Sequence, residues 1–140
     1  MYVDTSCLVA FFIPEIHTEK ANSVILEAQE LHISSLTKVE FISALNKKLH
    51  MGTIDSGDAE LISSEFERQI NERIFIEHHF EVQHFRRAEI MLKQTTLPLL
   101  SLDSLHLSIC FLQRQPLFTF DEVLAKAAKE FGIEVIPYSG

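Results

Sequence analysis

Short apolar runs alternate with longer amphipathic segments along the chain, and the two patterns predict different elements. Runs too short to form a helix are typical of buried strands, and they lie at residues 2–3, 31–34, 74–76, 117–119 and 134–136. Apolar residues repeated at helical spacing predict helices, and these segments cover residues 6–12, 18–30, 36–50, 55–73, 81–95, 102–114 and 122–131. Strands that alternate with helices in this way are typical of a parallel sheet covered by helices on both faces.

The predicted fold is therefore α/β, with three layers in the order α/β/α around a central parallel sheet of four or five short strands. No Asn-Gly or Asp-Gly pair joins two of these strands, which disfavours β-hairpins. Helices are expected to break or end at Pro14, Gly52, Pro98 and Gly132. In folds of this class ligands bind beyond the carboxyl ends of the strands, so the residues that follow each strand carry the most functional information.

The composition is that of one ordinary globular domain. The chain has 140 residues, of which 46% are hydrophobic, with only 4 Gly and 4 Pro and no linker or internal repeat. We expect a single domain over residues 1–140, of a size that folds without a metal or a disulfide. Cys7 and Cys110 lie far apart in the sequence, outside any metal-binding pattern, and are expected to be buried, reduced thiols.

Acidic residues outnumber basic ones, which narrows the classes of function. The 20 Asp and Glu against 12 Lys and Arg give a net charge of −8. This balance argues against a protein that binds nucleic acid through bulk positive charge alone, although it leaves local basic patches open. The first residues lack the basic segment of a signal peptide, and no apolar stretch approaches the roughly 20 residues of a membrane span. We therefore expect a cytoplasmic protein without a membrane segment.

Three aspartates stand at positions where a site is expected. Asp4 follows the first predicted strand and Asp121 follows the strand at 117–119, and each also precedes a helix, so each could be a helix cap and nothing more. Asp103 lies in the first turn of a helix that is apolar nearly all round. Burying an ionised carboxylate there without a partner would be costly, which favours a functional role for Asp103.

Glu40 alone favours the opposite interpretation. The helix over 36–50 carries an apolar face made of Val39, Ile42, Leu45 and Leu49. At about 100° per residue, Glu40 and Lys47 lie together on the other side. Helical phase therefore predicts an exposed Glu40 that contributes only to solubility.

The four acids together are more informative than any one of them. Asp4 and Asp121 end strands that could be neighbours in a parallel sheet, and Glu40 and Asp103 lie near the starts of helices that could border the same edge. Four clustered carboxylates repel one another and raise each other's pKa. A hard divalent cation with oxygen ligands, Mg²⁺ or Mn²⁺, relieves this repulsion.

Histidines do not form a competing metal site. No second pair of ligands at zinc spacing flanks His78, His79 or His84. All three are therefore expected to be solvated.

The segments around these acids resemble those of the PIN-domain ribonucleases, and in particular the VapC-like toxins of type II toxin–antitoxin systems. The resemblance extends from Tyr2 to about Ile136. The segments that carry it are Tyr2–Val9 with the opening Asp-Thr-Ser, Ser35–Phe41 with the Glu-bearing helix, Leu102–Ser108 with the motif Asp-Ala-Leu-His-Leu-Ala, and Phe118–Asp121 with the Thr-x-Asp before a closing helix and strand.

The resemblance implies a site built from Asp4, Glu40, Asp103 and Asp121, in which one or two Mg²⁺ or Mn²⁺ ions serve to hydrolyse a phosphodiester bond of RNA. It also implies polar positions beside the acids that orient ligands or metal-bound water; these are Thr5, Ser6 and Thr119. For a toxin it implies an antitoxin partner whose tail occupies the acidic site through a basic residue. The apolar faces of the helices at 18–30 and 55–73 could serve a homodimer or antitoxin contact, or could face the chain's own core.

Two positions depart from the family pattern. The residues before Asp103, at 98–101, lack the basic residue that is often found there, and Ser104 replaces the usual Ala. His106 matches a common His of the family, but its mainly apolar helix face favours a structural role.

A divalent ion can activate water and neutralise charge on the oxygens of a phosphodiester. We expect Asp4 and Asp103 to ligate the metal most directly, Asp121 to complete or orient the site, and Glu40 to hold metal-bound water or act as general base. Candidate residues for gripping RNA are Lys38, Lys47 and Lys48, which could equally do no more than solvate their helix.

Two alternatives stay open at this point. A phosphotransferase of the haloacid-dehalogenase kind would use Asp4 as nucleophile, but it needs a second Asp two residues later, where this chain has Ser6. The other alternative is a domain of the same fold that binds RNA or a partner protein with little or no nuclease activity.

Overall fold

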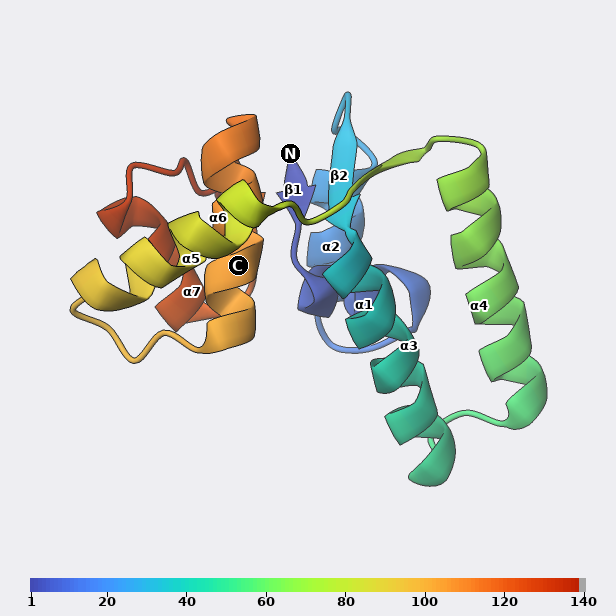
Figure 1. Ribbon diagram of the computed structural model, residues 1–140. Coiled ribbons are helices and arrows are strands. Elements are labelled where there is room, and N and C mark those ends of the chain that lie inside the picture. Colours follow the sequence, from blue (N-terminus) through green and yellow to red (C-terminus); the bar gives the residue numbers. More distant parts are fainter. Residues whose placement is uncertain (139–140) are drawn as a thin grey trace.

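A computed structural model describes residues 1–138 and places a parallel sheet between two layers of helices (Figure 1). The strands are β1 (Tyr2–Val3), β2 (Leu31–Ser34), β3 (Phe75–His78) and β4 (Leu117–Phe118), in the spatial order β3-β2-β1-β4. All three pairings are parallel. The predicted domain end at residue 140 lies outside the described residues.

The helices divide between the two faces of the sheet. They are α1 (Thr5–Phe12), α2 (Thr18–Ile25), α3 (Ser35–His50), α4 (Ser56–Asn71), α5 (Val82–Gln94), α6 (Ser101–Gln113) and α7 (Glu122–Glu130). In Figure 1, α5, α6 and α7 lie on one side of β1 and β2, whereas α1 to α4 lie on the other.

Alternation along the central strands supplies both cores. Tyr2 and Leu117 pack among buried residues of α5, α6 and α7, whereas Val3 and Phe118 pack among buried residues of α1 to α4. Successive side chains of a strand point to opposite faces of the sheet, so two residues of β1 are enough to contact both helical layers. The three-layer α/β/α fold predicted from the sequence is confirmed.

Two predicted elements are shorter in the structure. The strand expected at 134–136 is reduced to one parallel bridge between Val135 and Leu117, and Pro137 directly after it has no N–H to extend the ladder. The helix expected over 18–30 ends at Ile25. The residues after it lead into β2, and the Glu30 carbonyl accepts a hydrogen bond of 3.1 Å from the Met1 amine.

Other local expectations hold. Gly52 and Gly132 adopt φ of +74° and +75° just after α3 and α7, the left-handed conformation that ends helices and favours glycine. Cys7 and Cys110 are buried free thiols, and burial raises the pKa of both above the ordinary value. Among residues 1–138, no helix combines the length and apolar character needed to cross a membrane.

The prediction that the three histidines are solvated is wrong for His84, while His78 is half-buried and His79 is exposed. His84 is 2% exposed, and its Nδ1 accepts a hydrogen bond of 2.9 Å from the backbone N–H of Glu81. His78 of β3 stacks on His32 of β2, with an Nε2 to Nδ1 distance of 2.7 Å. The prediction was based only on the absence of zinc-ligand spacing. It did not take into account that pairing of β2 with β3 stacks the ring of His78 on that of His32.

Four phenylalanines hold α4 against the rest of the fold. Phe66 is the buried residue of this helix, and its ring centroid lies 4.3 Å from that of Phe41, 5.5 Å from that of Phe12 and 5.9 Å from that of Phe75. These rings come from α1, α3, α4 and β3, so removing Phe66 loosens the attachment of a whole helix.

We predict that Phe66→Ala lowers the free energy of unfolding by about 3–5 kcal/mol, because it leaves a cavity among the three remaining rings. Urea denaturation measures this change. Phe85→Ala is the matched control, since Phe85 is 54% exposed. Equal losses in the two variants would contradict the account of how α4 is anchored.

Candidate active site at the carboxyl edge of the sheet

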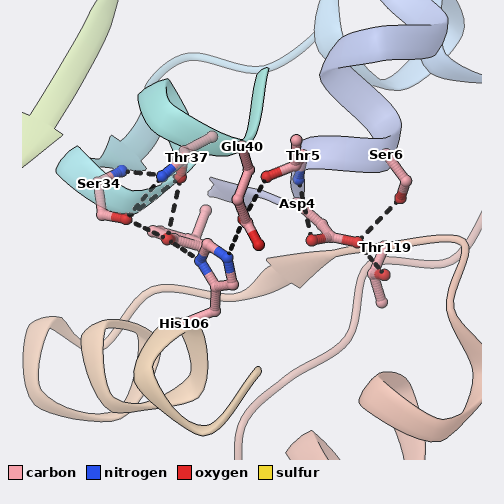
Figure 2. A network of polar contacts seen from close by, with 9 residues as sticks. Asp4, Thr5, Ser6, Ser34, Thr37, Glu40, His106 and Thr119 are labelled. Carbon is pink, nitrogen blue, oxygen red and sulfur yellow. Dashed lines mark hydrogen bonds and ion pairs between the residues drawn. The ribbon is translucent and has the colours of Figure 1, made fainter. Parts of the chain in front are cut away.

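Asp4 is held at the carboxyl end of β1 by hydrogen bonds from three directions (Figure 2). It is the N-cap of α1, with Oδ1 accepting from the backbone N–H of Thr5 at 2.9 Å. Its Oδ2 accepts from the hydroxyls of Ser6 at 2.9 Å and Thr119 at 2.8 Å. Only 9% of Asp4 is exposed, so its carboxylate has one fixed orientation, with lone pairs left over for a ligand. The role of Asp4 as a helix cap is therefore compatible with a second role in a site.

Thr119 links this aspartate to Asp121. Its Oγ1 donates to Asp4 and accepts from the backbone N–H of Asp121 at 3.0 Å. Asp121 is exposed and caps α7, because its Oδ1 accepts from the N–H groups of Val123 and Leu124 at 2.9 and 3.0 Å. Parallel pairing of β1 with β4 is what brings these two segments together.

Glu40 points toward the site, which contradicts the exposed position predicted from helical phase. The buried face of α3 consists of Thr37, Phe41 and Leu45, whereas Val39 and Ile42 are 67% and 46% exposed. The predicted apolar face of this helix was wrong because it included Val39 and Ile42, which face solvent.

The Glu40 carboxylate is held by partners from both helical layers. Its Oε1 accepts from the hydroxyl of Thr5 on α1 at 2.8 Å and from Nε2 of His106 on α6 at 2.5 Å (Figure 2). Partial burial acts to raise the pKa of Glu40, but the hydrogen bond and charge of His106, together with Thr5, outweigh it and lower the pKa. Glu40 is therefore ionised at neutral pH.

His106, for which a structural role is predicted, makes polar contacts as well as packing in the core. It is 1% exposed in the middle of α6, and its Nδ1 lies 2.5 Å from the hydroxyl oxygen of Tyr2. Tyr2 was not recognised from the sequence as part of a site. An aromatic residue in a buried strand is usually core, and nothing in the sequence marks its hydroxyl as a partner for a histidine.

The pKa of Asp103 is affected by the charges of the other three acids. Burial is the largest cause that raises the pKa of Asp103 above its ordinary value. The negative charge of Asp4 raises it further, followed by those of Asp121 and Glu40, whereas His106 acts to lower it. The four carboxylates are thus near enough to repel, although they come from four separate segments of the chain.

Comparison with known proteins decides the family. The family model described as PIN domain matches residues 1–130. The chain belongs to the PIN domain family. Among solved structures it is similar to VapC20 of Mycobacterium tuberculosis, described as a sarcin–ricin loop cleaving toxin, with a TM-score of 0.71 over 90% of this chain and 93% of that one. The identity is 15%, a level at which the likeness concerns the fold. A sequence comparison with curated proteins finds no match.

The donor chemistry of this PIN domain fits a hard divalent cation. All four acids offer carboxylate oxygens, which suit Mg²⁺ or Mn²⁺, and a cation would remove the repulsion that raises the pKa of Asp103. Within residues 1–138, no three side chains of His, Cys, Asp or Glu are grouped closely enough to hold a metal ion as they stand. The assignment of Asp4, Glu40, Asp103 and Asp121 to a metal site stays a prediction.

The candidate RNA-binding lysines are spread along α3. Lys38 Nζ lies 3.6 Å from Glu77 Oε1, so part of its charge is already compensated. Lys47 and Lys48 lie in the last turn of the helix, which at about 1.5 Å per residue is roughly 10 Å along the axis from Glu40.

The two departures from the family pattern have local consequences. Ser104 is buried where the family usually has Ala, and its hydroxyl donates to the carbonyl of Ser101 at 2.6 Å, so the extra polar atom is satisfied within α6. The segment at 98–101 brings Leu99 into the core and leaves Leu100 69% exposed, which presents an apolar surface rather than a basic one beside Asp103.

We predict that Asp103→Asn stabilises the metal-free protein at neutral pH, because it removes a half-buried charge that three neighbouring carboxylates repel. A carboxyl with a raised pKa in the folded state is destabilising once it ionises, so the advantage should shrink as the pH falls toward about 4. Thermal unfolding in EDTA at several pH values measures it. Glu67→Gln on α4 is the control, since it removes one exposed charge far along the chain. A destabilised Asp103→Asn variant at neutral pH would contradict the repulsion.

Proposed function

We propose that this PIN domain is a divalent-metal-dependent endoribonuclease and the toxin of a toxin–antitoxin pair. The observation that carries the proposal is the electrostatic coupling of Asp103 to Asp4, Asp121 and Glu40 at the carboxyl edge of the sheet. A cluster of carboxylates that raises the pKa of one member is costly to the fold unless it serves a cation. PIN domains are in general divalent-metal dependent.

Each acidic residue has a distinct task in the proposed reaction. When bound, Mg²⁺ or Mn²⁺ supplies an activated water and neutralises charge on the phosphodiester oxygens. Asp4 and Asp103 would hold the cation, and Asp121 would complete the site with the carboxylate oxygen that does not cap α7. Glu40, which is ionised, can accept a proton from water or hold a water molecule by hydrogen bond.

The surrounding hydroxyls would orient these acids. Thr119 and Ser6 both donate to one oxygen of Asp4, and Thr5 donates to Glu40. Hydrogen bonds of this kind fix a ligand before the metal arrives, which lowers the reorganisation needed at the reaction.

The toxin part of the proposal is supported by the likeness to VapC20, which covers most of both chains. That protein is described as cleaving the sarcin–ricin loop, so we infer a structured RNA as substrate here as well. The proposal includes a cytoplasmic location, a homodimer and an antitoxin that neutralises the acidic site with a basic residue. Lys38, Lys47 and Lys48 are the proposed contacts to the RNA backbone.

One observation favours the alternative of a PIN-fold binding domain without nuclease activity. No three acids within residues 1–138 are grouped as a preformed metal site. Calorimetry with Mn²⁺ separates the two functions, because the binding domain would take up no metal while all four acids are intact.

We predict that Asp4→Asn and Asp103→Asn each lower Mg²⁺- or Mn²⁺-dependent cleavage of a structured RNA by more than about 100-fold, beyond the roughly 10–100-fold typical of losing an outer partner of a metal site. Single-turnover cleavage assays with and without EDTA measure the effect. Asp58→Asn is the matched control, because Asp58 is an exposed aspartate in the first turn of α4. Wild-type rates in both site variants would refute the proposed function.

A further inference from the structure

A chain of hydrogen bonds runs under the proposed site and joins both helical layers to the central strand (Figure 2). It begins at Ser34 and Thr37, whose hydroxyls lie 2.8 and 3.2 Å from the hydroxyl of Tyr2. It continues from Tyr2 to Nδ1 of His106, and from Nε2 of His106 to the carboxylate of Glu40. Between Ser34 and His106 every member is buried, with no more than 1% of any residue exposed.

The hydroxyl of Tyr2 connects the other groups of this chain. It donates its one hydrogen to Ser34 Oγ at 2.8 Å, and the same oxygen lies 2.5 Å from Nδ1 of His106. The carboxylate of Glu40 can only accept, so Nε2 of His106 carries a hydrogen and donates it. Hydrogen bonds at both ring nitrogens therefore fix the orientation of the His106 imidazole, with Nε2 toward Glu40.

Glu40 needs such a partner, because its own helix does not bury it. The core-facing residues of α3 are Thr37, Phe41 and Leu45, and Glu40 lies beside this face, where a long side chain would otherwise keep several rotamers. Two contacts restrain its carboxylate, those with Thr5 and His106. His106 comes from the opposite side of the sheet, so this contact also ties Glu40 to the helix that carries Asp103.

We propose that Tyr2 and His106 are positioning residues that hold the Glu40 carboxylate in the orientation required at the metal site. The inference rests on the proposed function for its catalytic meaning, and on the buried hydrogen bonds for its geometry. It assigns a role to the histidine in the motif around Asp103 and to a tyrosine that the sequence marks only as core.

A purely structural role for the pair makes different predictions. Tyr2→Phe removes one oxygen atom and retains the ring that packs among α5, α6 and α7. His106→Gln can place an amide N–H near the former Nε2 and retain the donor to Glu40, whereas the shorter His106→Asn reaches only the position of Nδ1. If the ring were needed only for packing, Gln and Asn would have similar effects.

The test measures RNA cleavage and Mn²⁺ affinity for these three variants and for Ser108→Ala. Ser108 is the control, because it is buried on the same helix and its hydroxyl donates to the Leu105 carbonyl, outside the chain of hydrogen bonds. We expect Tyr2→Phe and His106→Asn to lower kcat and Mn²⁺ affinity by about 10–100-fold, with little change in KM for RNA. His106→Gln should recover much of both losses, and Ser108→Ala should retain wild-type values.

Unchanged kcat and Mn²⁺ affinity in Tyr2→Phe and His106→Asn would overturn the inference, as would equal losses in His106→Gln and His106→Asn or in Ser108→Ala. A wild-type protein that binds Mn²⁺ but cleaves no RNA would refute the proposed function, while the series of Mn²⁺ affinities would still decide the positioning role. A wild-type protein that binds no Mn²⁺ would overturn both.

Discussion

The pairing of β1 with a parallel strand on each side is the constraint on which the rest of the molecule depends. This strand has two residues, with Tyr2 in the core of one face and Val3 in the core of the other. The backbone N–H of Asp4 continues the pairing by donating to the Phe118 carbonyl at 2.9 Å. Asp4 is the residue directly after this two-residue strand, so its carboxylate lies at the edge of the sheet, where it accepts a hydrogen bond from Thr119.

The same edge concentrates negative charge at a cost to the fold. Four of the acids behind the net charge of −8 are those assigned to the proposed site, and the charges of Asp4, Asp121 and Glu40 contribute to the raised pKa of Asp103. Active sites commonly lower the stability of a fold when their function needs charged groups held in place. Because part of the negative charge is concentrated at the proposed site, the acidic composition argues against RNA binding by the metal-free protein. It leaves metal-assisted RNA binding open.

The order of elements could be predicted from the sequence because it depends on local patterns. Alternation of short apolar runs with helical repeats is a property of neighbouring residues. Asp4 directly follows β1 and Asp121 lies three residues after β4, so both could be predicted from the rule that ligands bind beyond the carboxyl ends of parallel strands. The strand predicted at 134–136 is only a bridge at Val135, since the sequence pattern of a strand does not show how many of its N–H groups find a partner.

The orientation of Glu40 and the burial of His84 could not be predicted in the same way. The side of α3 that faces the core is decided by packing of Phe41 against Phe12 and Phe66, contacts between residues far apart in the sequence. Exposed Val39 and Ile42 gave a stronger periodic signal than the buried positions. The link from Tyr2 to His106 was missed for a related reason, because a hydroxyl on a core aromatic has no signature in the sequence.

The central claim is that the four carboxylates form one electrostatic site for a divalent cation. Its most direct test is the pKa of the Asp103 side chain, measured by carbon-13 NMR without metal and with saturating Mg²⁺. In the metal-free protein we expect this pKa to lie above the ordinary value of about 3.9, and we expect it to decrease clearly when Mg²⁺ is added. An ordinary pKa that Mg²⁺ leaves unchanged would contradict the central claim.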